Sequence, residues 1–153
     1  MANTHMANTQ MSEHVRYRLA QSIPVIERHR AEILRVMQNR LVAFENKDEP
    51  FGQGDVVAMM LVGLLIDCAS DIAAFGGTRD LRPTMTEHKR LEIGGRYYSR
   101  FGMALAAVFR EVLGPRASPQ IISAWCDTYW FVIGKLSPGD ALPTWDGNLY
   151  VVR

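Results

Sequence analysis

The feature that most constrains the fold of this chain is a series of apolar stripes with helical spacing, interrupted by glycine and proline. In the first stripe, Val15, Leu19, Ile23 and Ile26 recur at steps of three and four residues. Such steps place side chains on one face of a helix, whereas the side chains of a strand alternate every second residue. The only stretch that suggests alternation is residues 148–152. The sequence therefore predicts an all-α fold whose helices pack as crossed layers.

Capping and helix-breaking residues divide the chain into separate helices. Polar residues that commonly cap helix N-termini are Ser12, Asp55, Thr84 or Thr86, and Ser118. The pairs that end helices are Gly76-Gly77, Gly114-Pro115 and Pro138-Gly139. The expected helices are one that starts at Ser12 and is interrupted by Pro24, then residues 30–46, 56–75, a short helix that carries His88, 96–113 and 119–136.

Length and composition indicate one folded unit with a polar segment at each end. At 153 residues the chain can fold around a single hydrophobic core, and 48% of its residues are hydrophobic. Residues 1–11 are expected to form a disordered tail and residues 138–153 an irregular one. Residues 12–137 then form the domain, in which Cys68 and Cys126 are expected to be reduced core residues.

Charge and hydropathy argue against two classes of partner. Lys plus Arg number 17 and Asp plus Glu 16, so the net charge of +1 supplies no field for binding a nucleic acid. The longest apolar run, residues 56–66, is about half as long as a bilayer crossing. The start of the chain lacks the basic and apolar regions of a secretion signal. We expect a cytoplasmic protein that binds neither nucleic acid nor membrane.

The most informative series of residues begins at His88 and reaches the last helix. The series is His88, Leu91, Ile93, Tyr98, Gly102, Leu105, Leu113-Gly114, Ala124-Trp125 and Tyr129. Its order and spacing resembles the second half of bacterial single-domain haemoglobins and of the globin domain of flavohaemoglobins. Ile23-Pro24 and the helix after it are similar to the first two helices of that family. The resemblance implies a globin fold for residues 12–137.

The resemblance also implies that His88 is the proximal ligand of the iron of a b-type haem, with Tyr98 packed beside it. A neutral imidazole is a good iron ligand, and an apolar pocket retains the haem. The implied function is reversible binding of a diatomic gas, O2, NO or CO. The local sequence by itself supports another interpretation, because Glu87, Lys89 and Arg90 around His88 would suit a surface histidine in a polar turn.

On the other side of the haem the sequence departs from the family. Gln38 stands where the family usually has a tyrosine, and it is either a hydrogen-bond donor to the gas or a solvent-facing residue. Val57 stands at the usual place of a distal Gln or His, with Leu61 one turn further on. Phe44 or Phe51 could be the phenylalanine that wedges the haem. The remaining haem contacts that we expect are Met37, Ile93, Tyr98 and Phe101.

Three alternatives stay open for the function. They are a haem-based gas sensor, an NO dioxygenase with a separate reductase, and a haem-free module that acts through protein contacts. In flavohaemoglobins a glutamate joins the proximal Tyr and His, and its nearest counterpart here is Asp140, beyond the helix-breaking Pro138-Gly139. Loss of that carboxylate predicts a globin-like rather than a peroxidase-like proximal side.

Trp130 suggests an interface. The apolar stripe of the last helix contains Trp125, Tyr129, Val132, Ile133 and Leu136, and Trp130 falls outside it. A large aromatic side chain near the surface often marks a contact between proteins. The sequence thus predicts a homodimer through the last two helices, unless Trp130 packs on the helix that begins near Arg96.

Overall fold

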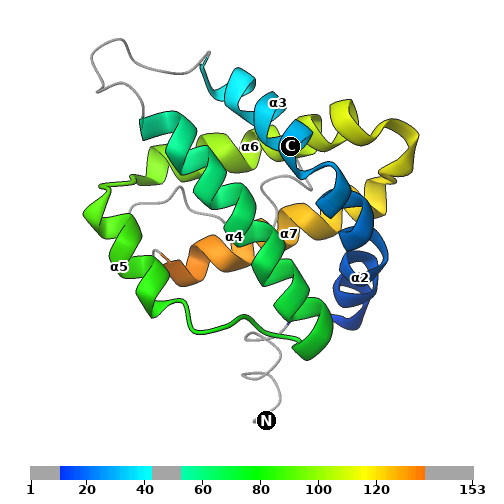
Figure 1. The fold of residues 1–153 in the computed structure, drawn as a ribbon. Coiled ribbons are helices and arrows are strands. Elements are labelled where there is room, and N and C mark those ends of the chain that lie inside the picture. The colour runs from blue at the N-terminus through cyan, green and yellow to red at the C-terminus, as the bar shows by residue number, and fades with distance from the viewer. Residues whose placement is uncertain (1–10, 43–52, 137–153) are drawn as a thin grey trace.

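The computed structural model describes residues 11–42 and 53–136, and within these ranges the chain is made of helices and the turns between them. The elements are α2 (Glu13–Arg28), α3 (Arg30–Val42), α4 (Gln53–Phe75), α5 (Arg82–Arg90), α6 (Gly95–Leu113), the short 3-10 helix η1 (Gly114–Arg116) and α7 (Pro119–Leu136) (Figure 1). No strand occurs in the described ranges, and the predicted all-α fold of the globin type is confirmed. Residues 1–10 of the expected N-terminal tail, the expected tail 138–153 with the alternation at 148–152, and Asp140 lie outside the described residues, as do Phe44 and Phe51. Met11, the last residue of the expected N-terminal tail, is described and packs against the core.

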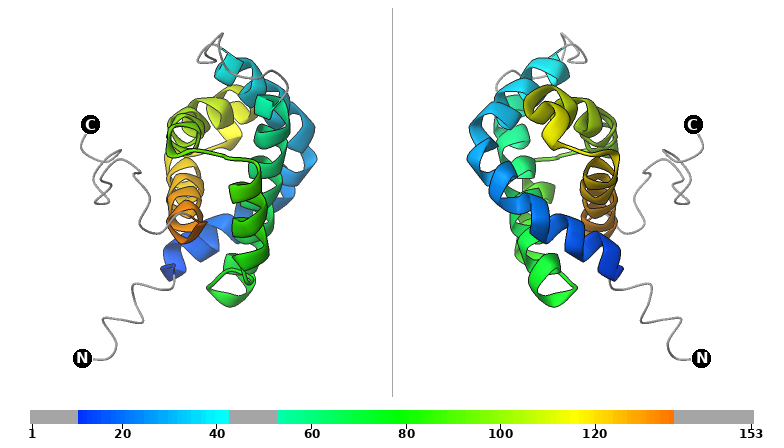
Figure 2. Two further views of the ribbon diagram at one scale, coloured as in Figure 1. Left: turned by 90° about the vertical axis from the view of Figure 1, so that its left-hand side faces the viewer. Right: turned by 90° about the vertical axis from the view of Figure 1, so that its right-hand side faces the viewer.

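The helices form two crossed layers. Figure 2 shows α6 and α7 on one side of the molecule and α3 and α4 on the other. In Figure 1, α4 runs diagonally across both α6 and α7. Helix α4 packs against α2, α3 and α7, whereas the main backbone contacts of α5 are with α7. The predicted crossed arrangement is therefore confirmed.

Polar caps account for the start of two helices. The Ser12 hydroxyl accepts a hydrogen bond from the Val15 amide at 3.3 Å, and Ser118 accepts one from Ile121 at 3.2 Å, as predicted. Helix α2 does not stop at Pro24, however, and runs on to Arg28. The prediction of an interruption there is wrong, because burial of the apolar face on both sides of the proline outweighs its missing hydrogen bond.

Two helices begin earlier than predicted. Helix α4 begins at Gln53, two residues before the expected cap Asp55. Helix α5 begins at Arg82, so that neither Thr84 nor Thr86 caps it. Pro83 lies in the first turn of α5, where the amide hydrogen that proline lacks has no partner within the helix. Proline in a first turn was the signal for the true start of this helix.

The core lies between the two layers and is dominated by aromatic side chains. Its largest fully buried members include Trp125, Tyr98, Tyr129, Phe101 and Phe109. The Trp125 indole donates a hydrogen bond to the Ser22 hydroxyl at 2.7 Å, which satisfies a polar group deep in the core. Cys68 and Cys126 are buried free thiols, as predicted, and burial raises the pKa of each to about 12.

Trp130 belongs to this core and is only 7% exposed. Its ring packs edge-on against Tyr129, and a Cβ atom at Gly102 on α6 would overlap it. The interpretation of Trp130 as a surface residue is wrong, and the alternative, packing on α6, is confirmed. Helical periodicity missed this because the absence of a side chain at Gly102 opens room on α6. The homodimer stays a prediction, without Trp130 in its support.

Helix α4 is long and apolar enough, over Asp55–Phe75, to cross a membrane, with a mean hydropathy of 2.0. Half of that window is buried inside the fold, which is also typical of the core helix of a globular protein. The continuous run at 56–66 understated how apolar this helix is, because the apolar residues extend well beyond it. The absence of membrane binding remains a prediction.

Candidate functional site

His88 is a buried residue near the end of α5, with 4% of its surface exposed. Its neighbours Lys89 and Arg90 are exposed, and Glu87 is half-buried. Adjacent residues of a helix point in directions about 100° apart, so charged neighbours do not determine which way His88 points. The interpretation as a surface histidine in a polar turn is therefore wrong.

Tyr98 on α6 contacts the imidazole of His88 and fixes its orientation. The Nδ1 atom of His88 and the Tyr98 hydroxyl are 2.7 Å apart, and the two rings are nearly parallel, with an interplanar angle of 19°. Tyr98 is itself held by α7, because the Tyr129 hydroxyl donates to its backbone carbonyl at 2.7 Å. Three helices thus fix one imidazole, which is the kind of support that orients a metal-ligating histidine.

The surroundings of His88 favour the neutral imidazole. Burial lowers the pKa of His88, and the opposing attraction of the Glu87 carboxylate is the smaller effect. When the proton lies on Nδ1, that nitrogen donates to the Tyr98 hydroxyl and Nε2 keeps a free lone pair. Nε2 has no hydrogen-bond partner among the described residues. In that tautomer His88 could coordinate a metal through Nε2.

The turn after α5 closes the C-terminal end of the helix that carries His88. Glu92 adopts a left-handed conformation with φ of 57°, which non-glycine residues rarely do. This turn lets the Ile93 amide donate to the His88 carbonyl at 3.2 Å, while the Glu92 amide donates to Lys89 at 3.0 Å. The last carbonyls of α5 are satisfied in this way.

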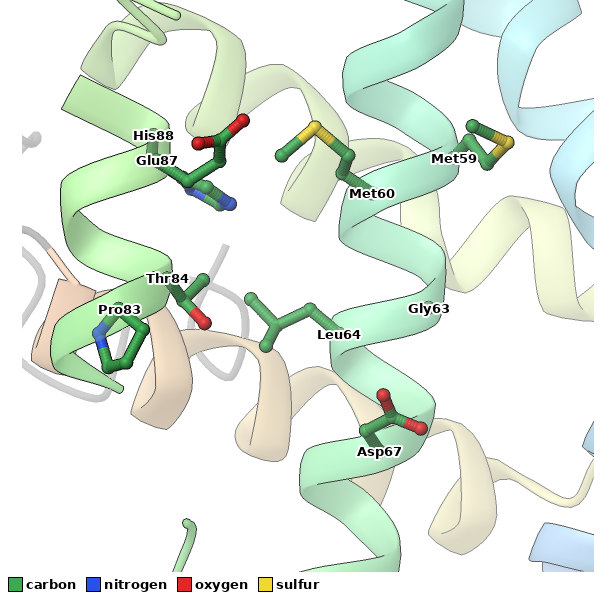
Figure 3. A pocket seen from close by; sticks show the side chains of 9 residues that line it. All are labelled: Met59, Met60, Gly63, Leu64, Asp67, Pro83, Thr84, Glu87 and His88. Atoms are coloured by element: carbon green, nitrogen blue, oxygen red, sulfur yellow. The ribbon is translucent and has the colours of Figure 1, made fainter. Parts of the chain in front are cut away.

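An open cavity of about 430 Å³ lies between α4 and α5, which is within the usual range for ligand sites. It is lined by Met59, Met60, Gly63, Leu64 and Asp67 from α4 and by Pro83, Thr84, Glu87 and His88 from α5. Figure 3 shows the Met60 and Leu64 side chains extending from α4 toward α5, where the edge of the His88 ring faces them. The imidazole thus stands in one wall of the cavity, opposite apolar side chains.

The two carboxylates that line the cavity have arginine partners. Glu87 pairs with Arg90, whose hydrogen bonds hold the pKa of Glu87 below its ordinary value. Asp67 lies 3.9 Å from Arg79, the residue that also forms a two-pronged pair with Asp71. Arg79 belongs to the segment between α4 and α5, so its pair with Asp71 joins that segment to α4.

The side chains that could ligate a metal suit one that is already bound within a cofactor. Within the described ranges, no group of three or more His, Cys, Asp or Glu side chains could hold a bare metal ion. A single buried imidazole beside an apolar cavity fits instead an iron whose other ligands come from a porphyrin. The residues present therefore fit a haem.

The structure places most of the other expected haem contacts away from the cavity. Met37, Val57, Leu61 and Phe101 are buried in the core, and Ile93 is half-buried in the turn after α5. None of them lines the cavity between α4 and α5. Their contact with a cofactor stays a prediction.

Gln38 lies at the contact between α3 and α4. Its side-chain amide donates to the Asp55 carbonyl at 3.2 Å, and the residue is half-buried. This hydrogen bond occupies one of the two amide hydrogens. The role of Gln38 as a donor to a bound gas stays a prediction.

The cavity contains residues that the sequence did not single out. Met60, Leu64 and Asp67 are spaced by four and three residues and so share one face of α4. Helix α4 is apolar around most of its circumference, and periodicity alone could not tell this face from the core face. A usable signal was Asp67, one of the few charged residues within this apolar helix.

No protein-family model matches the chain. Among curated proteins it is similar to the flavohemoproteins of two strains of Xylella fastidiosa, Temecula1 and 9a5c, each 23% identical over 136 residues. The alignment covers 86% of this chain and 34% of each relative, so the chain spans about a third of their length. The fold and this distant similarity indicate a globin-like protein.

Proposed function

We propose that the protein binds a b-type haem in the cavity between α4 and α5 through His88 and that it reversibly binds a diatomic gas there. The observation that carries the proposal is the setting of His88. The imidazole is buried, its Nδ1 lies 2.7 Å from the Tyr98 hydroxyl, and the residue lines the cavity, where its Nε2 has no hydrogen-bond partner among the described residues. Burial also lowers the pKa of His88. The similarity to flavohemoproteins supports the same cofactor.

Each residue of the site has a separate task. His88 supplies the lone pair, and Tyr98 holds the ring so that this lone pair points in one direction. Met60 and Leu64 cover the facing wall, exclude water and stabilise an apolar ring system by burying it. The haem, when bound, supplies an iron with a coordination position for O2, NO or CO.

The partner of His88 supports gas binding over oxygen activation. Among the described residues, the Nδ1 atom of His88 meets the Tyr98 hydroxyl rather than a carboxylate. A carboxylate would make the imidazole more basic and the iron more electron-rich, whereas a phenol does so less. We therefore propose reversible ligand binding as the activity.

A pair of histidine variants tests the proposal. His88→Ala removes the bond between protein and iron and leaves only hydrophobic burial to hold the haem. His14→Ala, at an exposed position on α2, serves as the matched control. We expect the control to take up one haem per chain and the His88 variant to lose stoichiometric uptake while its far-ultraviolet circular dichroism stays helical.

Added imidazole and CO sharpen this experiment. Free imidazole should restore part of the haem spectrum of the His88 variant by occupying the vacated position. CO should change the spectrum of the reduced, haem-loaded control. The proposal fails if His88→Ala keeps the spectrum of the unmodified protein, or if the unmodified protein takes up no haem.

A further inference from the structure

Two adjacent methionines on α4 differ in where their side chains point. Met60 is half-buried and lines the cavity, and Figure 3 shows its thioether directed toward α5 and His88. Met59 is 54% exposed, and Figure 3 shows its side chain pointing away from α5. Both methionines border the cavity, and of the two the Met60 sulfur is the one directed toward the imidazole across it.

We infer that the Met60 thioether is the second axial ligand of the haem iron, on the side opposite His88. The inference rests on the proposed function. The sulfur donates a lone pair and no proton moves, so coordination requires no acid or base. Thioethers are soft ligands that suit haem iron, and a His/Met pair raises its reduction potential.

The other polar groups of the cavity are less suited to this position. Thr84 lies on α5, the same helix as His88, and so cannot approach from the opposite side. Glu87 is on α5 as well. Asp67 is on α4 but lies two turns beyond Met60, about 10 Å further along the axis, and faces Arg79. Among the described lining residues, Met60 is the uncharged donor that faces His88.

The flexibility of methionine would allow Met60 to regulate gas binding. Its three rotatable bonds let the thioether bind or swing aside at small cost. A gas then binds only to the fraction of molecules in which Met60 is detached, which lowers the apparent affinity by that fraction. Met60 would thus compete with the gas for one coordination position.

Two leucine variants test the inference on the haem-loaded protein. Met60→Leu keeps the side-chain volume but removes the sulfur. Met103→Leu, at a position on α6 that is 70% exposed and does not line the cavity, is the matched control. We expect low-spin, six-coordinate spectra for the unmodified protein and for Met103→Leu, in both the ferric and the ferrous state. Met60→Leu should become high-spin, with a lower reduction potential, and should bind CO roughly tenfold faster if about a tenth of the unmodified ferrous protein is open.

Electron paramagnetic resonance and magnetic circular dichroism report the ligands without any assay of activity. The inference is overturned if the unmodified protein is high-spin, or if a low-spin spectrum persists in Met60→Leu. A sixth ligand whose spectrum changes with pH as water ionises would also overturn it, because a thioether does not titrate. Failure of the unmodified protein to bind haem would instead refute the proposed function itself.

Discussion

The contact between α6 and α7 and the contact between α4 and α5 differ in how closely the side chains pack. Between α6 and α7 aromatic rings interlock, with Phe101 and Tyr129 stacked at 5.1 Å and Phe109 edge-on to Trp125 at 5.6 Å. Between α4 and α5 the side chains stand apart around a cavity of about 430 Å³. The close pair is a rigid support, and the open pair leaves room for a ligand.

This contrast explains how the His88 imidazole can be held at Nδ1 while its other nitrogen lies on the open side. The Nδ1 atom of His88 forms its hydrogen bond with the closely packed side, through Tyr98 on α6. Its other nitrogen belongs to the open side. If α4 packed directly on α5, apolar side chains would cover Nε2 and leave a buried polar atom without a partner. An open helix pair avoids that cost.

Leucine truncation on the two faces of α4 should give the largest difference. Leu61 is 1% exposed in the core, whereas Leu64 is half-buried and lines the cavity. Leu61→Ala should lower the free energy of unfolding by about 3 kcal/mol, and Leu64→Ala by less than about 1 kcal/mol, because its site is already open. Urea unfolding of the haem-free protein measures both. Equal losses would mean that the cavity wall is as tightly packed as the core.

Adding a methyl group tests the same contrast from the other direction. A Cβ atom at Gly102 would overlap the Trp130 ring and lie 2.8 Å from the Tyr129 ring, but at Gly63 the nearest atom is an Arg30 nitrogen at 3.8 Å. Gly102→Ala should cost about 2 kcal/mol of stability. Gly63→Ala should be neutral or stabilise by up to about 1 kcal/mol, since alanine favours the helix. Thermal unfolding of both variants would refute this if their order were reversed.

The smallest expected effect concerns the ion pair that joins the segment before α5 to α4. Hydrogen bonds from Arg79 hold the pKa of Asp71 below its ordinary value. The pair therefore stabilises the fold above the unfolded pKa of about 4, and this stabilisation is lost as the pH falls further. Asp71→Asn should cost at most about 1 kcal/mol at pH 7, because Arg79 is half exposed. The difference from the unmodified protein should shrink below about pH 4, and a constant difference across that range would contradict the assignment.

Residues whose signals are local were predictable from the sequence. The helical stripes, the caps Ser12 and Ser118 and the glycine that follows α4 depend on short-range geometry, and the structure contains all of them. The burial of His88 could be predicted only because the spacing of a whole series of residues resembled a family. Its immediate neighbours indicated the opposite.

Features that depend on how two helices meet were not predictable. Trp130 is buried because Gly102 on another helix leaves it room. The sequence left Gln38 either as a donor to a bound gas or as a solvent-facing residue, and it did not predict that the amide donates to the Asp55 carbonyl where α3 meets α4. The cavity face of α4 could not be chosen because nearly every face of that helix is apolar. Each of these depends on a crossing geometry that no single helix encodes.

The hydrogen bond from Tyr129 to the Tyr98 carbonyl makes α7 and the imidazole one mechanical linkage. A rotation of the His88 ring must either break its hydrogen bond with Tyr98 or carry Tyr98 with it. Tyr98 cannot shift alone, because its carbonyl is tied to α7 and both tyrosines are fully packed. A strain that arises at the imidazole is thus transmitted through two hydrogen bonds to the last described helix of the chain.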